Sequence, residues 1–446
     1  MPFNLNKINT ENFGSFCFKL SIFLLPSAFG ISIIFILISL ITRIIESGFK
    51  EIIKNKWNIS LLAALFFMIF SCISSQRLLL DLEFYNIPSS YFKNWSPSYS
   101  WIGLFNWAPF FLIFLYFQKY LSSPEERKKV GKLLILGTIP VFISGFLQTW
   151  FGVYGPYEIL NGLVIWYQRE IYEEKLPVFT AMFNNQNYAG AWLNIIWPFT
   201  LAILTNSYSE KIKRYILFFL CILFTLATYT TYSRNAYLGY LISISSFSNL
   251  RPISIITIIL ISSILIIPLL VFSNLNPGLY NFLKLFIHPR FLNASNFFTF
   301  FLDSPRINIW FKSIKYILMR PFWGWGAASF PLIYSLYKMN FVNDKIQHSH
   351  NLFFETSISY GIIFSTIIFI LFFRLLYDSW KVIFNKNGDL INKSLWLATL
   401  LFIINHMFDV TYYDVRLSMI FWILLASLES IRKEDQLTNN LEIKSN

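Results

Sequence analysis

The chain has 446 residues, of which 55% are hydrophobic and only 13% are charged. Soluble domains carry roughly 25% Asp, Glu, Lys and Arg, and here 20% of all residues are aromatic. So few charges could not cover a water-soluble protein of this length, and the long apolar runs exclude a disordered or collagen-like chain. The composition therefore predicts an integral membrane protein.

The net charge of +13 does not indicate nucleic-acid binding in such a chain. Lys and Arg of membrane proteins gather in cytoplasmic loops that face anionic lipid, and no basic cluster interleaved with exposed aromatics stands out. Cys17, Cys72 and Cys221 lie in apolar stretches without CxxC spacing, so we expect neither disulfides nor thiolate metal sites. The N-terminus lacks a small-residue cleavage site, and its first apolar stretch indicates a retained anchor.

Apolar stretches long enough to cross a bilayer, about 20 residues, recur along the chain. Two of them, Leu20–Thr42 and Ile253–Phe272, contain no charged residue. Slightly interrupted candidates are 59–76, 100–118, 132–151, 188–205, 212–230, 234–249, 352–377, 394–409 and 415–430. This pattern predicts an all-α polytopic fold.

Basic residues concentrate in alternate loops, which sets the expected orientation. The basic loops, expected to be cytoplasmic, are 43–56, 119–132, 211–214 and 374–393. The alternation is regular if residues 14–45 cross twice, with a break at Pro26 and Ser27. We therefore predict about twelve spans with both termini cytoplasmic; eleven spans with an outer N-terminus is the alternative.

Two of the expected outer loops are distinctive. Residues 152–186 are polar and aromatic, and residues 273–350 form a loop too long for a simple connector. Within the second loop, apolar residues recur at helical spacing along one side of 306–320: Ile307, Trp310, Phe311, Ile314 and Ile317. This spacing predicts an amphipathic helix lying on the membrane surface.

Ionisable residues where outer loops meet helix ends are the candidates for chemistry. His350 stands just before the helix expected from Leu352, where a neutral imidazole could accept a proton from a hydroxyl. His348 is two residues away, but no third ligand with metal spacing follows, so no metal is assigned. The alternative for His350 is a helix-capping or interface residue.

Two arginines at expected helix starts suit an anionic ligand. Arg234 follows a very short outer turn, and Arg306 begins the amphipathic helix. A guanidinium binds phosphate oxygens through two hydrogen bonds, and a helix N-terminus adds free N–H groups. The alternative for either residue is anchoring to lipid headgroups.

Several polar residues form a third group of candidates. Asn184, Asn185 and Asn187 enter a span from the outer side, where amides can bind sugar hydroxyls or cap the helix. His406 and Asp409 are three residues apart, so Asp409 either balances a basic partner or pairs locally with His406.

Four motifs in this order resemble the O-antigen ligase family, over roughly residues 180–370. They are FNNQNYAG, TTYSRNAYLGY, Arg306 leading into PFWGWGAASF, and HSHNLFFETSISYG. The family signature continues from His350 and Asn351 through nine residues to Gly361, and this chain departs from it at Phe364. The departure weakens assignment to the ligase branch and leaves the catalytic His in place.

The resemblance implies glycan transfer from undecaprenyl diphosphate to an acceptor hydroxyl at the periplasmic face of the bacterial inner membrane. It implies a GT-C-like fold without metal or other cofactor, His350 as general base, Arg234 and Arg306 as diphosphate ligands, and support from Asn187, Asn351 and Asp409. The expected domains are 1–180, an O-antigen ligase-like domain over 181–375 that includes the periplasmic loop 273–350, and 376–446. The expected partners are a lipid-linked glycan, a lipid or glycan acceptor and membrane lipid.

Three alternatives to a ligase stay open. The first is a Wzy-type polymerase with the same chemistry and a growing glycan as acceptor. The second is a transporter, since some relatives of this family carry an inorganic-carbon transport label. The third is a non-catalytic scaffold. Asp81 and Glu83 in the first outer loop also resemble the D-x-E metal motif of some lipid-dependent glycosyltransferases, although paired carboxylates are common in such loops.

Overall fold

A computed structural model describes residues 5–48, 55–76, 95–173, 176–206, 211–247, 305–338, 346–385 and 389–445. The predicted span Ile253–Phe272, residues 273–304 of the predicted loop 273–350, and Asp81 and Glu83 lie outside these residues. The structural statements below concern the described residues.

The described chain is almost entirely helical, which confirms the predicted all-α class. Six helical segments are long and apolar enough to cross a membrane: α2 (Phe29–Ser47), α4 (Asn58–Gln76), Ser98–Leu121, α8 (Pro124–Phe151), α9 (Gln186–Asn206) and α19 (Ile362–Asn385). The segment Ser98–Leu121 comprises α6 (Ser98–Gly103), η2 (Leu104–Asn106), α7 (Ala108–Tyr116) and η3 (Phe117–Leu121). The total of about twelve spans and the GT-C-like arrangement stay predictions.

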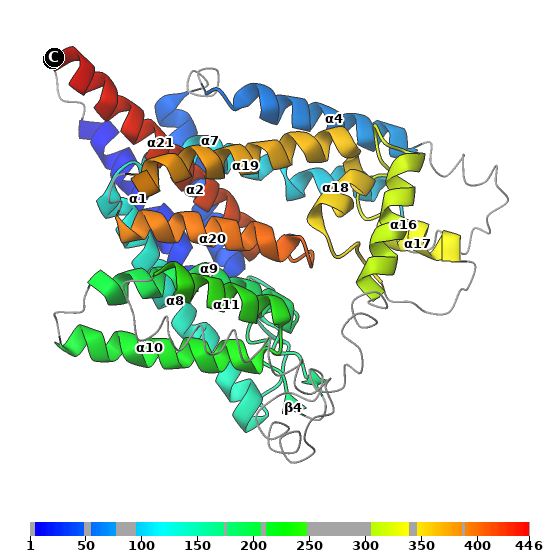
Figure 1. Cartoon of the computed structure of the whole chain (residues 1–446), viewed down its shortest axis with the longest axis horizontal. Coiled ribbons are helices and arrows are strands. Elements are labelled where there is room, and N and C mark those ends of the chain that lie inside the picture. The colour runs from blue at the N-terminus through cyan, green and yellow to red at the C-terminus, as the bar shows by residue number, and fades with distance from the viewer. Residues whose placement is uncertain are drawn as a thin grey trace, which may run out of the picture.

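The remaining helices are shorter, less apolar or end in polar tails. They are α1 (Leu5–Leu24), α10 (Lys211–Thr230), α11 (Arg234–Ser246), α16 (Pro305–Met319), α17 (Phe330–Lys338), α18 (Leu352–Tyr360), α20 (Leu390–His406) and α21 (Val415–Ser445). Figure 1 shows α4, α19, α20, α9 and α10 running in broadly the same direction, whereas α16 runs across them near their ends.

The first apolar stretch is divided as the sequence predicted. Helix α1 ends at Leu24 and α2 begins at Phe29, with Pro26 in the turn between them. The two helices pack antiparallel: the Ser32 hydroxyl donates to the Ser21 carbonyl oxygen at 2.8 Å. The chain therefore reverses direction within residues 14–45.

The core is built around α9 and α21. Helix α9 packs on α8, α10, α11 and α20, and α21 packs on α7, η3, α19 and α20. Residues 417–428 of α21 are buried on every side, as expected of a helix that is apolar all round. These two helices hold the ends of α11 and α20 in place at the site described below.

Helix α18 is separated from α19 by Gly361, which has φ of +90°. A Cβ atom at this position would lie 2.0 Å from the carbonyl oxygen of Phe322, so only glycine fits. The loop after α16 is hydrogen-bonded to the end of α18, next to this junction. The Trp325 and Gly326 amides donate to the Ile358 and Ser359 carbonyls at 2.7 and 3.0 Å. Helix α16 is thereby fixed to the α18–α19 junction.

The predicted aromatic loop 152–186 contains two short hairpins. Strand β1 (Tyr157–Ile159) pairs antiparallel with β2 (Val164–Trp166), and β3 (Tyr172–Glu173) pairs with β4 (Leu176–Pro177). The indole N–H of Trp166 donates to the Ser27 carbonyl at 2.7 Å, which ties the first hairpin to the α1–α2 turn.

Candidate active site

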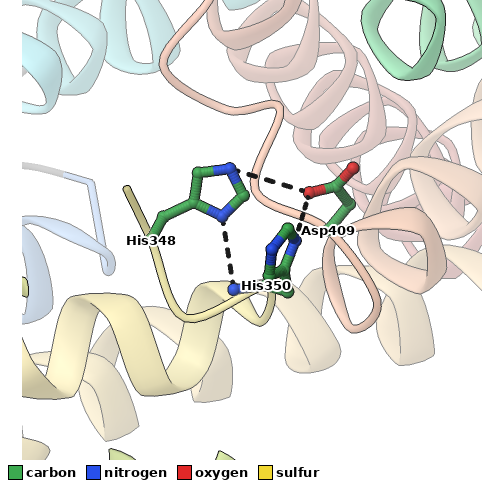
Figure 2. A group of neighbouring side chains, drawn as sticks. All are labelled: His348, His350 and Asp409. Atoms are coloured by element: carbon green, nitrogen blue, oxygen red, sulfur yellow. Dashed lines mark hydrogen bonds and ion pairs between the residues drawn. The ribbon is translucent and has the colours of Figure 1, made fainter. Parts of the chain in front are cut away.

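A histidine and an aspartate from two separate loops meet at one end of the helical bundle. His350 precedes α18, and Asp409 lies between α20 and α21. Nδ1 of His350 is 3.1 Å from Oδ1 of Asp409 (Figure 2), and Asp409 is 4% exposed. The His350 side chain is 27% exposed, so the ring is reachable from outside while its carboxylate partner is not.

The Asp409 carboxylate is held by further donors. The Asn187 side-chain amide donates to Oδ2 of Asp409 at 2.6 Å, and the Val410 backbone amide donates to Oδ1 at 2.9 Å. The Ser233 hydroxyl in turn donates to Oδ1 of Asn187 at 3.0 Å. A chain of hydrogen bonds, Ser233–Asn187–Asp409–His350, therefore joins the starts of α9 and α11 to the two loops.

The backbone around His350 is fixed from α18. Asn351 is the N-cap of that helix: its side chain accepts from the Phe354 amide at 3.1 Å and donates to the Met407 carbonyl at 3.0 Å. The buried Glu355 carboxylate accepts from the Ser349 amide at 2.8 Å. His350 itself has φ of +55°, a conformation that a non-glycine residue adopts only when its surroundings hold it.

The pKa values of two ionisable groups in the site, Asp409 and His348, are both lowered. Burial disfavours the ionised form of Asp409, but the His350 hydrogen bond and the nearby His348 and Arg306 outweigh it and hold the pKa of Asp409 at about 2. Burial and the neighbouring His350 lower the pKa of His348 to about 4. At neutral pH the site therefore contains an ionised Asp409 and a neutral His348.

Arg306 lies near Asp409 and His348. Arg234 adjoins the site only through the sequence, as the residue directly after Ser233. Arg306 is close enough to influence the pKa of both Asp409 and His348, and it belongs to the first turn of α16. Arg234 is the first residue of α11, directly after Ser233, and its side chain is exposed. The hydrogen-bond chain thus ends one residue from Arg234.

The other sequence candidates have different roles. Asn185 caps α9 by accepting from the Asn187 and Tyr188 amides at 2.9 and 3.2 Å, and Asn184 accepts from the Arg169 guanidinium at 3.1 Å. His350 is not the helix cap. The suggested local pair of His406 with Asp409 is wrong: α20 ends at His406, whose ring bonds the Phe402 carbonyl and the Thr411 hydroxyl.

The spacing of residues in the sequence did not predict one cluster of possible metal ligands. His348, His350 and Asp409 each offer a donor atom, and these atoms lie within 4.8 Å of one another (Figure 2). Nε2 of His348 is 3.9 Å from Oδ1 of Asp409, and Nδ1 of His348 accepts from the His350 amide at 3.3 Å. Two imidazoles and a carboxylate can hold a divalent transition metal, so the missing third ligand does exist, 59 residues beyond His350.

The fold and this site define a polytopic membrane protein with a histidine–carboxylate pair at one end of its bundle. Residues 219–370 match the family model described as O-antigen ligase. This region, about a third of the chain, is similar to the O-antigen ligase family, as the sequence motifs predicted. No curated protein matches the chain.

The matched region lies inside the predicted domain 181–375 and contains Arg234, Arg306 and His350. Asn187 and Asp409 fall outside it, one on each side. The site is therefore completed by residues from beyond the matched region, and the predicted domain boundaries stay predictions.

Proposed function

We propose that this protein transfers a glycan from a polyprenyl diphosphate to an acceptor hydroxyl, with His350 as general base. The observation that carries the proposal is the His350–Asp409 pair, with a buried carboxylate that is ionised at neutral pH. An ionised carboxylate such as Asp409 can only accept hydrogen bonds, so the proton between the two residues is on Nδ1 of His350. In the neutral form of the ring, the other nitrogen, Nε2, is unprotonated and able to accept a proton.

The proposed step is a displacement at the anomeric carbon. The acceptor O–H gives its proton to Nε2 of His350 while its oxygen bonds to the anomeric carbon of the glycan. The bond from that carbon to the diphosphate oxygen breaks, and its electron pair leaves with the polyprenyl diphosphate. Asp409 stabilises the imidazolium that forms, and its own bonds from Asn187 and Val410 keep the carboxylate in place.

The leaving diphosphate gains negative charge, which the two arginines would stabilise. Arg306 already influences the charges of the site, and Arg234 starts a helix whose first N–H groups favour anions. This assignment of Arg234 and Arg306 is part of the proposal, as is their action without a metal ion.

Two substitutions test the base directly. Asn readily adopts a left-handed backbone conformation, so His350→Asn keeps the fold at φ of +55° and removes the base. Asp409→Asn keeps the shape of the carboxylate but no longer fixes the His350 tautomer. We expect purified protein to lose transfer by about 10²- to 10⁴-fold in either variant, mainly in kcat.

The control is Asn184→Ala, which removes an exposed amide that accepts a hydrogen bond from Arg169. This variant should transfer at the normal rate. Normal transfer by a well-folded His350→Asn protein would overturn the base assignment. Uptake of a labelled solute into vesicles, lost in a deletion strain, would instead favour the transporter.

A gel of surface glycan from a deletion strain distinguishes the two enzyme types. Loss of all attached chains indicates a ligase, whereas a single repeat unit left on the core indicates a polymerase. Since the matched family contains both types, this experiment decides the acceptor and leaves the proposed role of His350 unchanged.

Metal independence has its own test. Removal of divalent ions with EDTA should leave the transfer rate unchanged if His350 acts as a base. Added Zn²⁺ should inhibit, because coordination by His348, His350 and Asp409 would take the carboxylate away from the base. Loss of activity in EDTA, restored by a divalent metal, would show that the cluster works as a metal site.

A further inference from the structure

Helix α16 has two apolar faces, and the described part of the chain buries only one of them. Ile309, Tyr316 and Ile317 are buried in a cluster with residues of α17 and α18. On the other side, Phe311, Ile314 and Leu318 are 68%, 42% and 73% exposed. The helical spacing predicted a single apolar side, which combined residues of both faces. Spacing alone does not tell which neighbours cover a helix.

The segment directly after α16 contacts a candidate membrane span. The Trp323 ring, just beyond α16, stacks on Phe67 and Phe70 of α4, with ring centroids 5.6 and 5.1 Å apart. Helix α4 is one of the candidate spans, and its exposed side chains recur at helical spacing: Ile59, Leu62, Phe66, Phe70 and Ile73. A span with such a stripe would turn it towards lipid, and the segment that follows α16 packs against this span through Trp323.

The direction and charge of α16 fit the surface of a bilayer. In Figure 1, α16 runs across α4 and α19 near their ends, and so lies along the membrane plane. Residues 305–330 contain four basic residues and no acidic one. Lys315 is exposed beside the apolar face, where its ammonium can reach lipid phosphate while its stem follows the acyl region.

We propose that α16 is an interfacial helix whose Phe311–Ile314–Leu318 face enters the leaflet on the side of the His350 site. Its occupant is the headgroup and upper acyl region of anionic phospholipid. The Trp310 ring contacts those of Phe354 and Phe408, at centroid distances of 6.3 Å each, so α16 also touches α18 and the loop that carries Asp409. Arg306, in its first turn, is thereby held at headgroup depth.

Site-directed fluorescence quenching tests the proposal on the full chain in nanodiscs that contain phosphatidylglycerol. A bimane probe is attached to Leu318→Cys or Ile314→Cys after replacement of the three native cysteines. Quenching by lipids with a nitroxide high on the acyl chain is compared with quenching by aqueous iodide. The matched controls are Leu62→Cys on the lipid side of α4 and Glu170→Cys in the exposed hairpin region.

We expect the α16 probes to be quenched at least 2-fold more by the lipid nitroxide than by iodide, as at Leu62→Cys. Quenching like that of Glu170→Cys would overturn the proposal, because the face would then be in water. Protection from both quenchers would also overturn it, because protein would then cover the face. Neither outcome depends on the transfer reaction, so the proposed function could fail while this inference stands.

Discussion

At the scale of residues, the site is defined by which groups can change their charge near neutral pH. Asp409, with its pKa at about 2, stays ionised, and His348, with its pKa at about 4, stays neutral. Neither residue therefore changes its charge in the physiological range. In the proposed reaction, the exposed ring of His350 takes the proton of the incoming hydroxyl.

His348 provides a prediction with a definite sign. Folding lowers the pKa of His348 from 6.5 to about 4. The contribution of His348 to the free energy of unfolding is therefore complete above pH 6.5, decreases as the pH falls from 6.5 to 4, and stays constant below pH 4. That contribution is about 3 kcal/mol at most. The melting temperature of His348→Asn in detergent should therefore decrease less than that of the natural protein between pH 7 and pH 4.5.

The same substitution should leave the shape of the pH–rate profile between pH 6 and pH 8 unchanged. An equal loss of stability in both proteins on acidification would contradict the assignment of the acid sensitivity to His348. This pair of measurements distinguishes a residue that supports the His350 backbone from one that takes part in proton transfer.

At the scale of elements, the first turns of α9 and α11 control the carboxylate through Asn187. Asn187→Ala removes a 2.6 Å hydrogen bond to a buried charge, which is worth about 1.5–3 kcal/mol. We expect a decrease of about 10- to 100-fold in kcat with KM nearly unchanged. Asn185→Ala, which removes the cap of α9 instead, should lower the melting temperature while kcat per folded molecule stays normal.

The partial rescue of Asn187→Ala by Asn187→Gln would support positioning through an amide donor. A proportional loss of activity and folded protein in both asparagine variants would instead assign Asn187 to stability alone. Ser233 extends this argument, because its hydroxyl orients the Asn187 amide so that the nitrogen faces Asp409.

Hydropathy and motif spacing predicted the helices and the main site residue for clear physical reasons. Apolar runs of bilayer length have no other stable structure, and His350 stands where a loop meets a helix. Asp409 was a candidate partner for a basic residue, but the pattern could not show that this residue is His350, because the two are 59 residues apart. The contact between Asn187 and Asp409, 222 residues apart, also forms only through packing of α9 against α20. The left-handed backbone of His350 likewise has no signal in a single sequence.

At the scale of the whole molecule, a buried cation holds the helices together at the end of the bundle opposite to the site. Arg127 at the start of α8 is 1% exposed and donates to the Leu121 carbonyl, the Asn392 amide oxygen and the Glu434 carboxylate at 3.0, 2.9 and 2.7 Å. One guanidinium thereby joins η3, α8, α20 and α21. The basic segment 119–132, which is expected in the cytoplasm, lies at this end.

Arg127→Met should destabilise the protein by about 2–3 kcal/mol, because it removes three hydrogen bonds of a buried charge. Transfer per folded molecule should stay normal, since Asn392 and His406 stand at opposite ends of α20. Lys129→Met, which removes an exposed cation paired with Glu126, is the control and should melt like the natural protein. A selective loss of transfer in Arg127→Met would reveal coupling between the two ends of the bundle.

The origin of Asp409 in the loop between the last two described helices has a consequence for biosynthesis. A ribosome delivers Asn187, Arg234 and His350 to the membrane first, and the carboxylate that sets the histidine tautomer arrives only with α20 and α21. A nascent or truncated chain that ends after α19 would hold every residue of the matched family region and still lack a competent base. In the proposed reaction, such a chain would not transfer glycan until α20 and α21 have been synthesised.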